Sequence, residues 1–250
     1  MSKVSVKKND SSTAVMTKPV VEEVIPFSPQ GSGIAGLHGE FSVEDRKLPF
    51  LSIIQGVGEN AAKYKSNHGD LLYNKELLVP RPVSVNFYGL KKIYTQNLAF
   101  DSSGVGPRPL TFETAEQVLE QGGNLRKYVT PGADDNNYVP QAFAFVALES
   151  PQDGWGAAVD YRGLVEDVFL IPALWVLRGV GYRRVTPLLL SVQDMLIPER
   201  KELAYARFTL DTQYEKVGGN WIYSAVVTKQ KDGKRNSDGY VQKLHEMFGE

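Results

Sequence analysis

The fold is decided first by residues 206–230, which read ARFTLDTQYEKVGGNWIYSAVVTKQ. Two stretches that alternate apolar and polar residues flank Gly218-Gly219, and this pair is a strong signal for a tight turn because glycine adopts positive φ freely. The pattern predicts a β-hairpin. Trp221 and Tyr223 face the partner strand in this hairpin, so we expect both rings to lie in the core.

Outside the hairpin, short apolar runs separated by turn residues indicate further strands. These runs lie at residues 48–55, 70–74, 83–96, 141–150 and 167–177. The last run is apolar almost throughout, which is typical of a strand buried on both faces. We therefore expect its Trp175 in the core.

Helix signals are fewer. Thr114 and Gln117 match a capping box, in which each side chain bonds the backbone of the other, and predict a helix from this point. Thr186 and Pro187 resemble an N-cap followed by proline at the first helical position, and predict that a second helix begins here. A short helix near the end of the chain is expected at residues 240–248.

Many short strands with two or three inserted helices predict a β-rich α+β fold. A Greek-key barrel or sandwich fits this pattern best, and an OB-like barrel is among the options. We expect residues 1–40, rich in Ser, Lys, Gly and Pro, to form a flexible basic arm. Residues 41–230 would form a single domain, and residues 231–250 a polar C-terminal tail.

Composition excludes several kinds of chemistry. The chain of 250 residues has no cysteine, which rules out disulfides, thiolate zinc sites and a cysteine nucleophile, and it has only three histidines. No apolar run approaches the roughly 20 residues of a membrane helix. The lysines near the N-terminus precede no apolar segment, so we expect no secretory signal and a cytoplasmic protein.

Cofactor motifs give no site. Residues 31–36 spell G-x-G-x-x-G, but prolines precede them and no helix pattern follows, so a linker is the natural interpretation. No P-loop, zinc-protease or nucleophile-elbow motif is present. We expect no cofactor and no resident metal.

The net charge of −1 conceals an uneven distribution. Residues 63–94 hold six basic side chains against Asp70 and Glu76, whereas residues 110–170 hold ten carboxylates against three basic side chains. A nearly neutral chain can therefore present a basic face, and the local field is what attracts an anionic partner.

Aromatic and basic residues are interleaved in four places, around residues 63–65, 88–94, 175–184 and 221–231. Single-stranded nucleic acid requires this combination, since cations follow the phosphates and flat rings stack on bases of any identity. Along a strand, Lys92 and Tyr94 fall on one face, opposite Lys91.

These patterns predict a nucleic-acid-binding surface. Two glycines make residues 179–184 an expected accessible turn that presents one tyrosine and two arginines. The residues expected to hold phosphates are Lys63, Lys65, Arg81, Lys91, Lys92, Arg178, Arg183 and Arg184. Those expected to stack on bases are Tyr64, Tyr94, Tyr182 and Trp155.

The order of five segments resembles that of phage-type proteins found among replication genes. The segments are LPFLSIIQG, GDLLYN, PRPVSVNFYGLKKIY, PALWVLRGVGYRRVTPLLLS and ARFTLDTQYEKVGGNWIYSAVV, and they span roughly residues 45–228. The resemblance implies an OB-like core that binds single-stranded DNA without sequence specificity during replication or recombination. Many such proteins end in an acidic tail, whereas this chain ends in DGYVQKLHEMFGE, with mixed charge.

Two alternatives remain open beside this non-catalytic function. One is a viral structural or assembly protein whose basic N-terminal arm contacts neighbouring subunits; the arm would also serve self-association in a DNA-binding protein. The other is a metal-dependent nuclease, with Glu166 and Asp167, or the set from Asp194 to Lys201, as its acidic and basic groups.

Overall fold

The computed structural model describes residues 48–57, 59–98, 108–126, 132, 134–150, 155, 163–165, 168–230 and 235–248. The arm expected over residues 1–40 lies outside these ranges, and so do Glu166 and Asp167. The expectations attached to them stay predictions.

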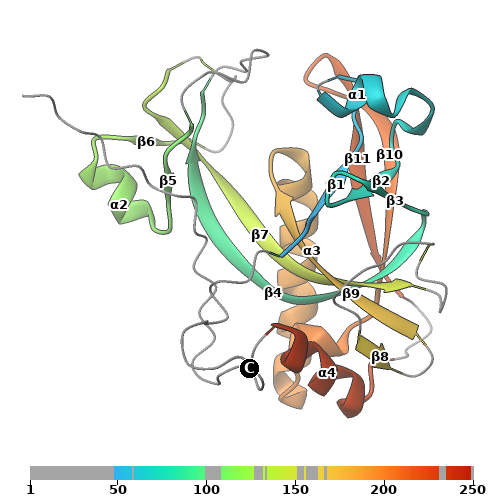
Figure 1. The fold of residues 1–250 in the computed structure, drawn as a ribbon. Helices are drawn as coiled ribbons and strands as arrows, with labels where there is room; N and C mark the ends of the chain where they lie inside the picture. The colour runs from blue at the N-terminus through green and yellow to red at the C-terminus, as the bar shows by residue number, and fades with distance from the viewer. Residues whose placement is uncertain are drawn as a thin grey trace, which may run out of the picture.

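One mostly antiparallel sheet dominates the described chain. Its strands are β1 (Phe50–Ile53), β2 (Leu71–Tyr73), β3 (Leu77–Val79), β4 (Val83–Gln96), β5 (Thr111–Phe112), β6 (Asn124–Leu125), β7 (Asn137–Ser150), β8 (Gly163–Val165), β9 (Val168–Leu177), β10 (Phe208–Val217) and β11 (Asn220–Lys229). The hydrogen-bonded order is β11-β10-β4-β7-β9-β1-β2-β3, with β5, β6 and β8 paired beside β4, β7 and β9. The sheet is strongly curled (Figure 1).

The helices are few and mostly short. They are α1 (Glu59–Lys63), α2 (Ala115–Glu120), α3 (Val180–Leu196) and α4 (Asp238–Phe248), with 3-10 turns η2 (Lys65–Asn67), η4 (Ile197–Glu199) and η5 (Leu203–Tyr205). None of the helices in the described ranges is long and apolar enough to cross a membrane. The predicted β-rich α+β class is confirmed, as are the five strand runs, the capped helix after Thr114 and the helix near residue 240.

The sheet buries both faces. On one face α3 contributes Val185, Leu189 and Val192 to an apolar cluster that includes Trp175, which is 5% exposed. On the other face α4 packs its own apolar side chains against β7 and β9. The predicted burial of Trp175 is therefore confirmed. The segment expected as a polar tail contains α4, whose buried side chains are Tyr240, Val241, Leu244 and Phe248.

The start of α3 differs from the sequence prediction. The helix begins at Val180, so Pro187 lies inside it and Thr186 is not its N-cap. The exposed Pro187 lacks the N–H that would bond the Arg183 carbonyl, a loss that solvent can offset on this side of the helix. The segment expected as an accessible turn is consequently the first turn of α3. Burial of Val185 against the sheet outweighs the local signal for a helix start.

The predicted hairpin is confirmed. β10 and β11 pair from Phe208 with Lys229 to Val217 with Asn220, and the turn residues Gly218 and Gly219 both have positive φ. This two-residue turn matches the right-handed twist of the paired strands. The hairpin projects beyond β4, because β10 pairs with β4 only over its first three residues.

The connection from β1 to β2 packs against this projecting part of the hairpin. Gln55 donates from Nε2 to the Tyr223 carbonyl at 2.7 Å and accepts from the Tyr223 N–H at 3.0 Å. The Tyr223 ring covers Gly69, where a Cβ would lie 2.5 Å from the ring. Both ends of the connection that carries α1 and η2 are thus attached to β11, beside which α1 lies in Figure 1.

Candidate functional site

Five of the predicted residues gather where β9 leads into α3. Arg178 directly follows β9, and Tyr182 and Arg183 lie in the first turn of α3. Lys92 and Tyr94 come from β4, with the Lys92 Nζ 4.8 Å from the centre of the Tyr94 ring. We call these five residues the α3-start cluster.

Tyr182 connects the two parts of this cluster electrostatically. A hydrogen bond to Tyr94 raises the pKa of Lys92, and the proximity of Tyr182 acts in the same direction. Sheet register supports the same placement, since Lys92 pairs with Ala142, which in turn pairs with Leu177 beside Arg178. Lys92 therefore carries its positive charge at neutral pH next to two aromatic rings.

The backbone at this point adds positive potential. α3 begins after Gly179, which has φ of 53°, and no side chain caps the helix. Its first turn also contains no acidic residue. Helix N-termini carry a partial positive charge, so the backbone reinforces the charges of Arg178 and Arg183.

Lys91 lies apart from the α3-start cluster, as the strand alternation predicted. Its Nζ contacts Glu113 Oε1 at 2.6 Å. This ion pair joins β4 to the segment between β5 and α2. Lys91 therefore has a structural role in addition to the one predicted.

Arg184 bonds the hairpin instead of facing the cluster. Its guanidinium contacts both carboxylate oxygens of Glu215 on β10, with Nη2 to Oε2 at 2.8 Å, and Ser224 on β11 bonds the same carboxylate. Arg184 and then Ser224 lower the pKa of Glu215 to about 2. The first turn of α3 is thus held to the hairpin, and the predicted phosphate contact by Arg184 would compete with this pair.

Arg81 is likewise engaged within the fold. Its Nε donates to Asp70 at 2.8 Å, and its Nη1 donates to the side chain and carbonyl of Thr212. Asp211 lies 3.6 Å from the same guanidinium. Arg81 therefore connects β10 to the end of the β1–β2 connection.

The three predicted residues 63–65 lie on α1 and η2, away from β4. The Lys63 Nζ is 5.0 Å from the centre of the Tyr64 ring, and Lys65 is exposed. The Tyr64 hydroxyl donates to the Lys75 carbonyl at 3.2 Å, which fixes the ring against the β2–β3 turn. This group is a second basic and aromatic surface, beside the hairpin.

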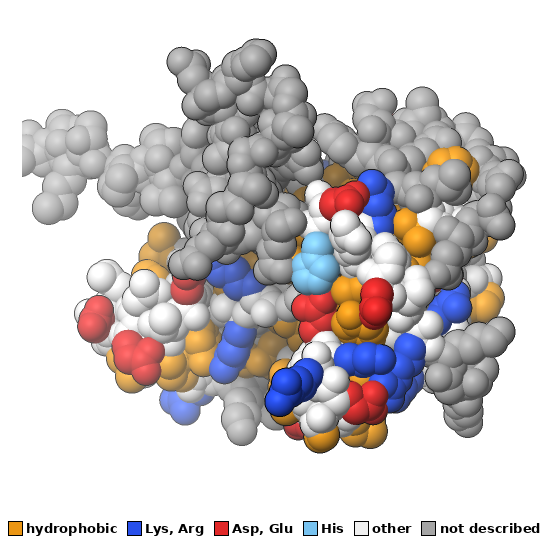
Figure 2. All heavy atoms as spheres, turned by 90° about the horizontal axis from the view of Figure 1, so that it is seen from below, with side chains coloured by type: hydrophobic (Ala, Val, Ile, Leu, Met, Phe, Trp, Pro, Cys, Tyr) orange, Lys and Arg blue, Asp and Glu red, His pale blue; other side chains and the backbone are white. Residues whose placement is uncertain are grey.

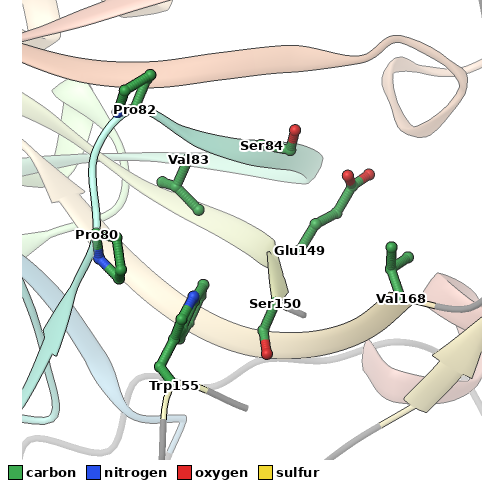
Figure 3. A pocket seen from close by; sticks show the side chains of 8 residues that line it. All are labelled: Pro80, Pro82, Val83, Ser84, Glu149, Ser150, Trp155 and Val168. Carbon is green, nitrogen blue, oxygen red and sulfur yellow. The ribbon is translucent and has the colours of Figure 1, made fainter. Parts of the chain in front are cut away.

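Trp155 lies at a third location, in a pocket of about 260 Å³ between the starts of β4 and β9 and the end of β7. Figure 3 shows Trp155 and Pro80 on one side of the pocket and Val168 on the other. Glu149 also lines the pocket, but its carboxylate is bonded by Tyr240 at 2.7 Å and by Asn86. Trp155, predicted to stack on a base, is thus half-buried in a pocket that it shares with Glu149, whose carboxylate already accepts hydrogen bonds within the protein.

The acidic groups of the nuclease alternative do not converge in the described part of the chain. Glu199 forms a two-pronged ion pair with Arg235, with Oε1 to Nη2 at 2.6 Å, and Lys201 lies over the Tyr205 ring. Asp194 is exposed on α3. No group of three His, Asp or Glu side chains that could hold a metal ion is found among the described residues.

The face around α4 has mixed charge. Figure 2 shows acidic and basic side chains interspersed over its described part. Several are paired, among them Lys243 with Glu246 at 2.7 Å and His245 with Glu202 at 2.6 Å. Positive charge on this face is therefore interspersed with carboxylates, whereas the first turn of α3 contains no acidic residue.

No protein-family model, curated protein or solved structure matches this chain. The case for a function therefore depends on the geometry and chemistry of its own residues.

One aromatic surface, at the end of the hairpin, was not predicted from the sequence. Trp221 is 59% exposed and Tyr214 is 57% exposed, so the expected burial of Trp221 is wrong, while Tyr223 is half-buried. Lys216 pairs with Trp221 across the strands and shares its face. We call Tyr214, Lys216, Trp221 and Tyr223 the hairpin platform. The sequence feature that could have indicated this exposure is the closeness of these residues to the Gly-Gly turn, because the end of a long hairpin projects past its neighbouring strands.

Proposed function

We propose that this protein binds single-stranded DNA without sequence specificity and without catalysing a reaction. The observation that carries the proposal is the α3-start cluster, where two strand residues meet the first turn of α3. Its Lys92, Arg178 and Arg183 offer charges to phosphates, and Tyr94 and Tyr182 offer rings to bases. Such a combination suits a flexible strand whose phosphates and bases are both accessible.

The proposal extends to the biological setting that the resemblance implies. The curled sheet supports the idea of an OB-like core, although an OB-like identity is part of the proposal. The protein would coat exposed DNA during phage-type replication or recombination, in the cytoplasm of the host. Self-association through the N-terminal arm would add cooperativity along the strand.

The test is fluorescence anisotropy of a labelled oligo-dT, titrated with protein at two salt concentrations. We expect binding that weakens steeply with salt, since each phosphate that the protein neutralises releases counterions. Replacing Lys92 and Arg183 together by alanine should weaken binding and reduce the slope of log K against log salt by about 0.7 for every phosphate that is no longer neutralised.

Lys243→Ala is the matched control, because it removes one lysine charge from α4, on the face of mixed charge. Its affinity should stay close to that of the wild type. Absence of binding at low salt would refute the proposal. A loss of affinity per removed charge that is as large in the control as in the Lys92 and Arg183 variant would contradict the α3-start cluster as the binding surface.

A further inference from the structure

The hairpin platform is an ordered stack of rings that faces solvent. The Tyr214 and Trp221 rings are 5.0 Å apart between centres and nearly parallel, at 20°. Tyr223 lies 4.8 Å from Tyr214 on the inner side. The ring pairs support the hairpin, but exposing two such large rings forgoes the free energy of burying them, and an exposed aromatic patch is typical of an interaction surface.

The platform is held rigidly from its inner end. Gln55 bonds both the N–H and the carbonyl of Tyr223, so these two groups point away from β10. Tyr214 and Tyr223 therefore form a non-hydrogen-bonded pair, in which the two side chains lie closer together. The Tyr223 ring is seated on Gly69. A ring stack that is already ordered loses little conformational entropy when a flat ligand adds to it.

Lysines lie on the face of the platform and on the connection that packs against it. Lys216 lies across from Trp221, and Lys63 and Lys65 belong to the connection that is attached to Tyr223 at both ends. The carboxylate of the neighbouring Glu215 is already neutralised by Arg184. A ligand with flat rings and negative charges matches this surface better than an apolar one.

We infer that the hairpin platform is a stacking site for unpaired nucleobases, with Trp221 as the outermost contact. The inference rests on the proposed binding of single-stranded DNA and adds a site that is separate from the α3-start cluster. A base would stack on the exposed indole, and the lysines would hold the flanking phosphates. Stacking of one base on an aromatic ring corresponds to about 5- to 150-fold in affinity.

The experiment compares oligo-dT with an abasic strand of equal length, using the full chain and a variant with Tyr214→Thr and Trp221→Thr. Threonine keeps the strand propensity, and both positions are exposed, so the variant should fold. The wild type should prefer oligo-dT to the abasic strand. In the variant this preference should be smaller by about 5- to 150-fold, and what remains comes from Tyr94 and Tyr182 of the α3-start cluster.

Tryptophan fluorescence supplies a second measurement. The chain has three tryptophans, of which Trp175 is buried. Oligo-dT should quench the emission of the wild type, and Trp221→Phe should remove most of this quenching. Trp175→Phe is the control, and it should leave the quenching intact because Trp175 lies in the core.

The outcomes separate this inference from the proposed function. If the double variant prefers oligo-dT as strongly as the wild type does, the platform does not stack bases, while DNA binding stands. If the wild type binds neither strand, the proposed function fails together with the platform. If sedimentation shows that the double variant disperses an oligomer without changing the preference, the platform is a contact between copies of the chain and the inference is overturned.

Discussion

At the scale of single residues, the same side-chain type serves different purposes according to its neighbours. Arg184 and Arg183 are adjacent in sequence, but Arg184 holds Glu215, whereas Arg183 contacts the Gly179 carbonyl at the start of α3. The tryptophans divide in the same way, since Trp175 is in the core and Trp221 is in solvent. Composition alone would not distinguish these pairs.

Gly69 gives a prediction at this scale. Gly69 and Gly219 have φ of 91° and 92°, but only a Cβ on Gly69 would meet the Tyr223 ring. Alanine at either position should incur the backbone cost of positive φ, roughly 1–2 kcal/mol. Gly69→Ala should lose about 1–3 kcal/mol more, because the added atom overpacks the ring.

Urea unfolding of the two glycine variants measures this difference. Gly219→Ala is the matched control, since nothing lies within 4 Å of its added Cβ. Equal destabilisation of the two variants would mean that the Tyr223 ring moves aside freely. The conclusion that Gly69 holds the hairpin platform rigid would then be wrong.

At the scale of elements, the first turn of α3 joins parts of the chain that are distant in sequence. Tyr182 lies near Lys92 of β4 on one side, and Arg184 bonds Glu215 of β10 on the other. The β4–β7 pair and the β10–β11 hairpin rise on either side of this turn (Figure 1). One helix start therefore sets where both candidate surfaces lie.

The pair of Arg184 and Glu215 gives a prediction about pH. The pKa of Glu215 is lowered from 4.5 to about 2 in the folded protein, so its contribution to stability is complete above the unfolded value and is lost as pH falls toward 2. The free energy of unfolding of the wild type should exceed that of Glu215→Gln by a constant margin above about pH 5 and by progressively less below it.

Urea midpoints of both proteins at several pH values between 2 and 7 measure this margin. Glu113→Gln is the comparison, since Glu113 is a more exposed carboxylate in the ion pair with Lys91. A margin between wild type and Glu215→Gln that does not change with pH would contradict the assigned role of Arg184.

At the scale of the whole molecule, helices cover both faces of the sheet, and a buried tyrosine hydroxyl links α4 to two of the strands. The Tyr240 hydroxyl of α4 donates to Glu149 on β7 at 2.7 Å and accepts from Asn86 on β4. Arg207 approaches the same carboxylate at 3.4 Å, and Asn236 bonds Asn86. These directional contacts add to the apolar packing that holds α4 against the sheet.

Tyr240→Phe should therefore destabilise the protein by about 1–3 kcal/mol, because it removes two hydrogen bonds from a buried network, one of them to the Glu149 carboxylate. Tyr88→Phe is the control, since its hydroxyl is half-buried, 3.3 Å from His245 Nδ1, and should cost about 1 kcal/mol or less. Thermal and urea unfolding measure both effects. A destabilisation by Tyr240→Phe no larger than that of the control would show that packing alone holds α4.

Elements whose signals are local could be predicted from the sequence. The Gly218-Gly219 turn, the capping box at Thr114 and the apolar run of β9 each depend on residues a few positions apart, and each prediction is confirmed. Strand alternation also separated Lys91 from Lys92 and Tyr94, as the structure has them. Turn chemistry and side-chain periodicity act over such short distances, so one sequence contains them in full.

Tertiary structure alone decided where α3 begins and which aromatic residues face solvent. The helix extends back past Pro187 because Val185 is buried against strands that are distant in sequence. Trp221 is exposed because β10 pairs with β4 over three residues only, which leaves the end of the hairpin without a neighbouring strand over its rings. Burial depends on which distant segments meet, and local pattern does not contain that information.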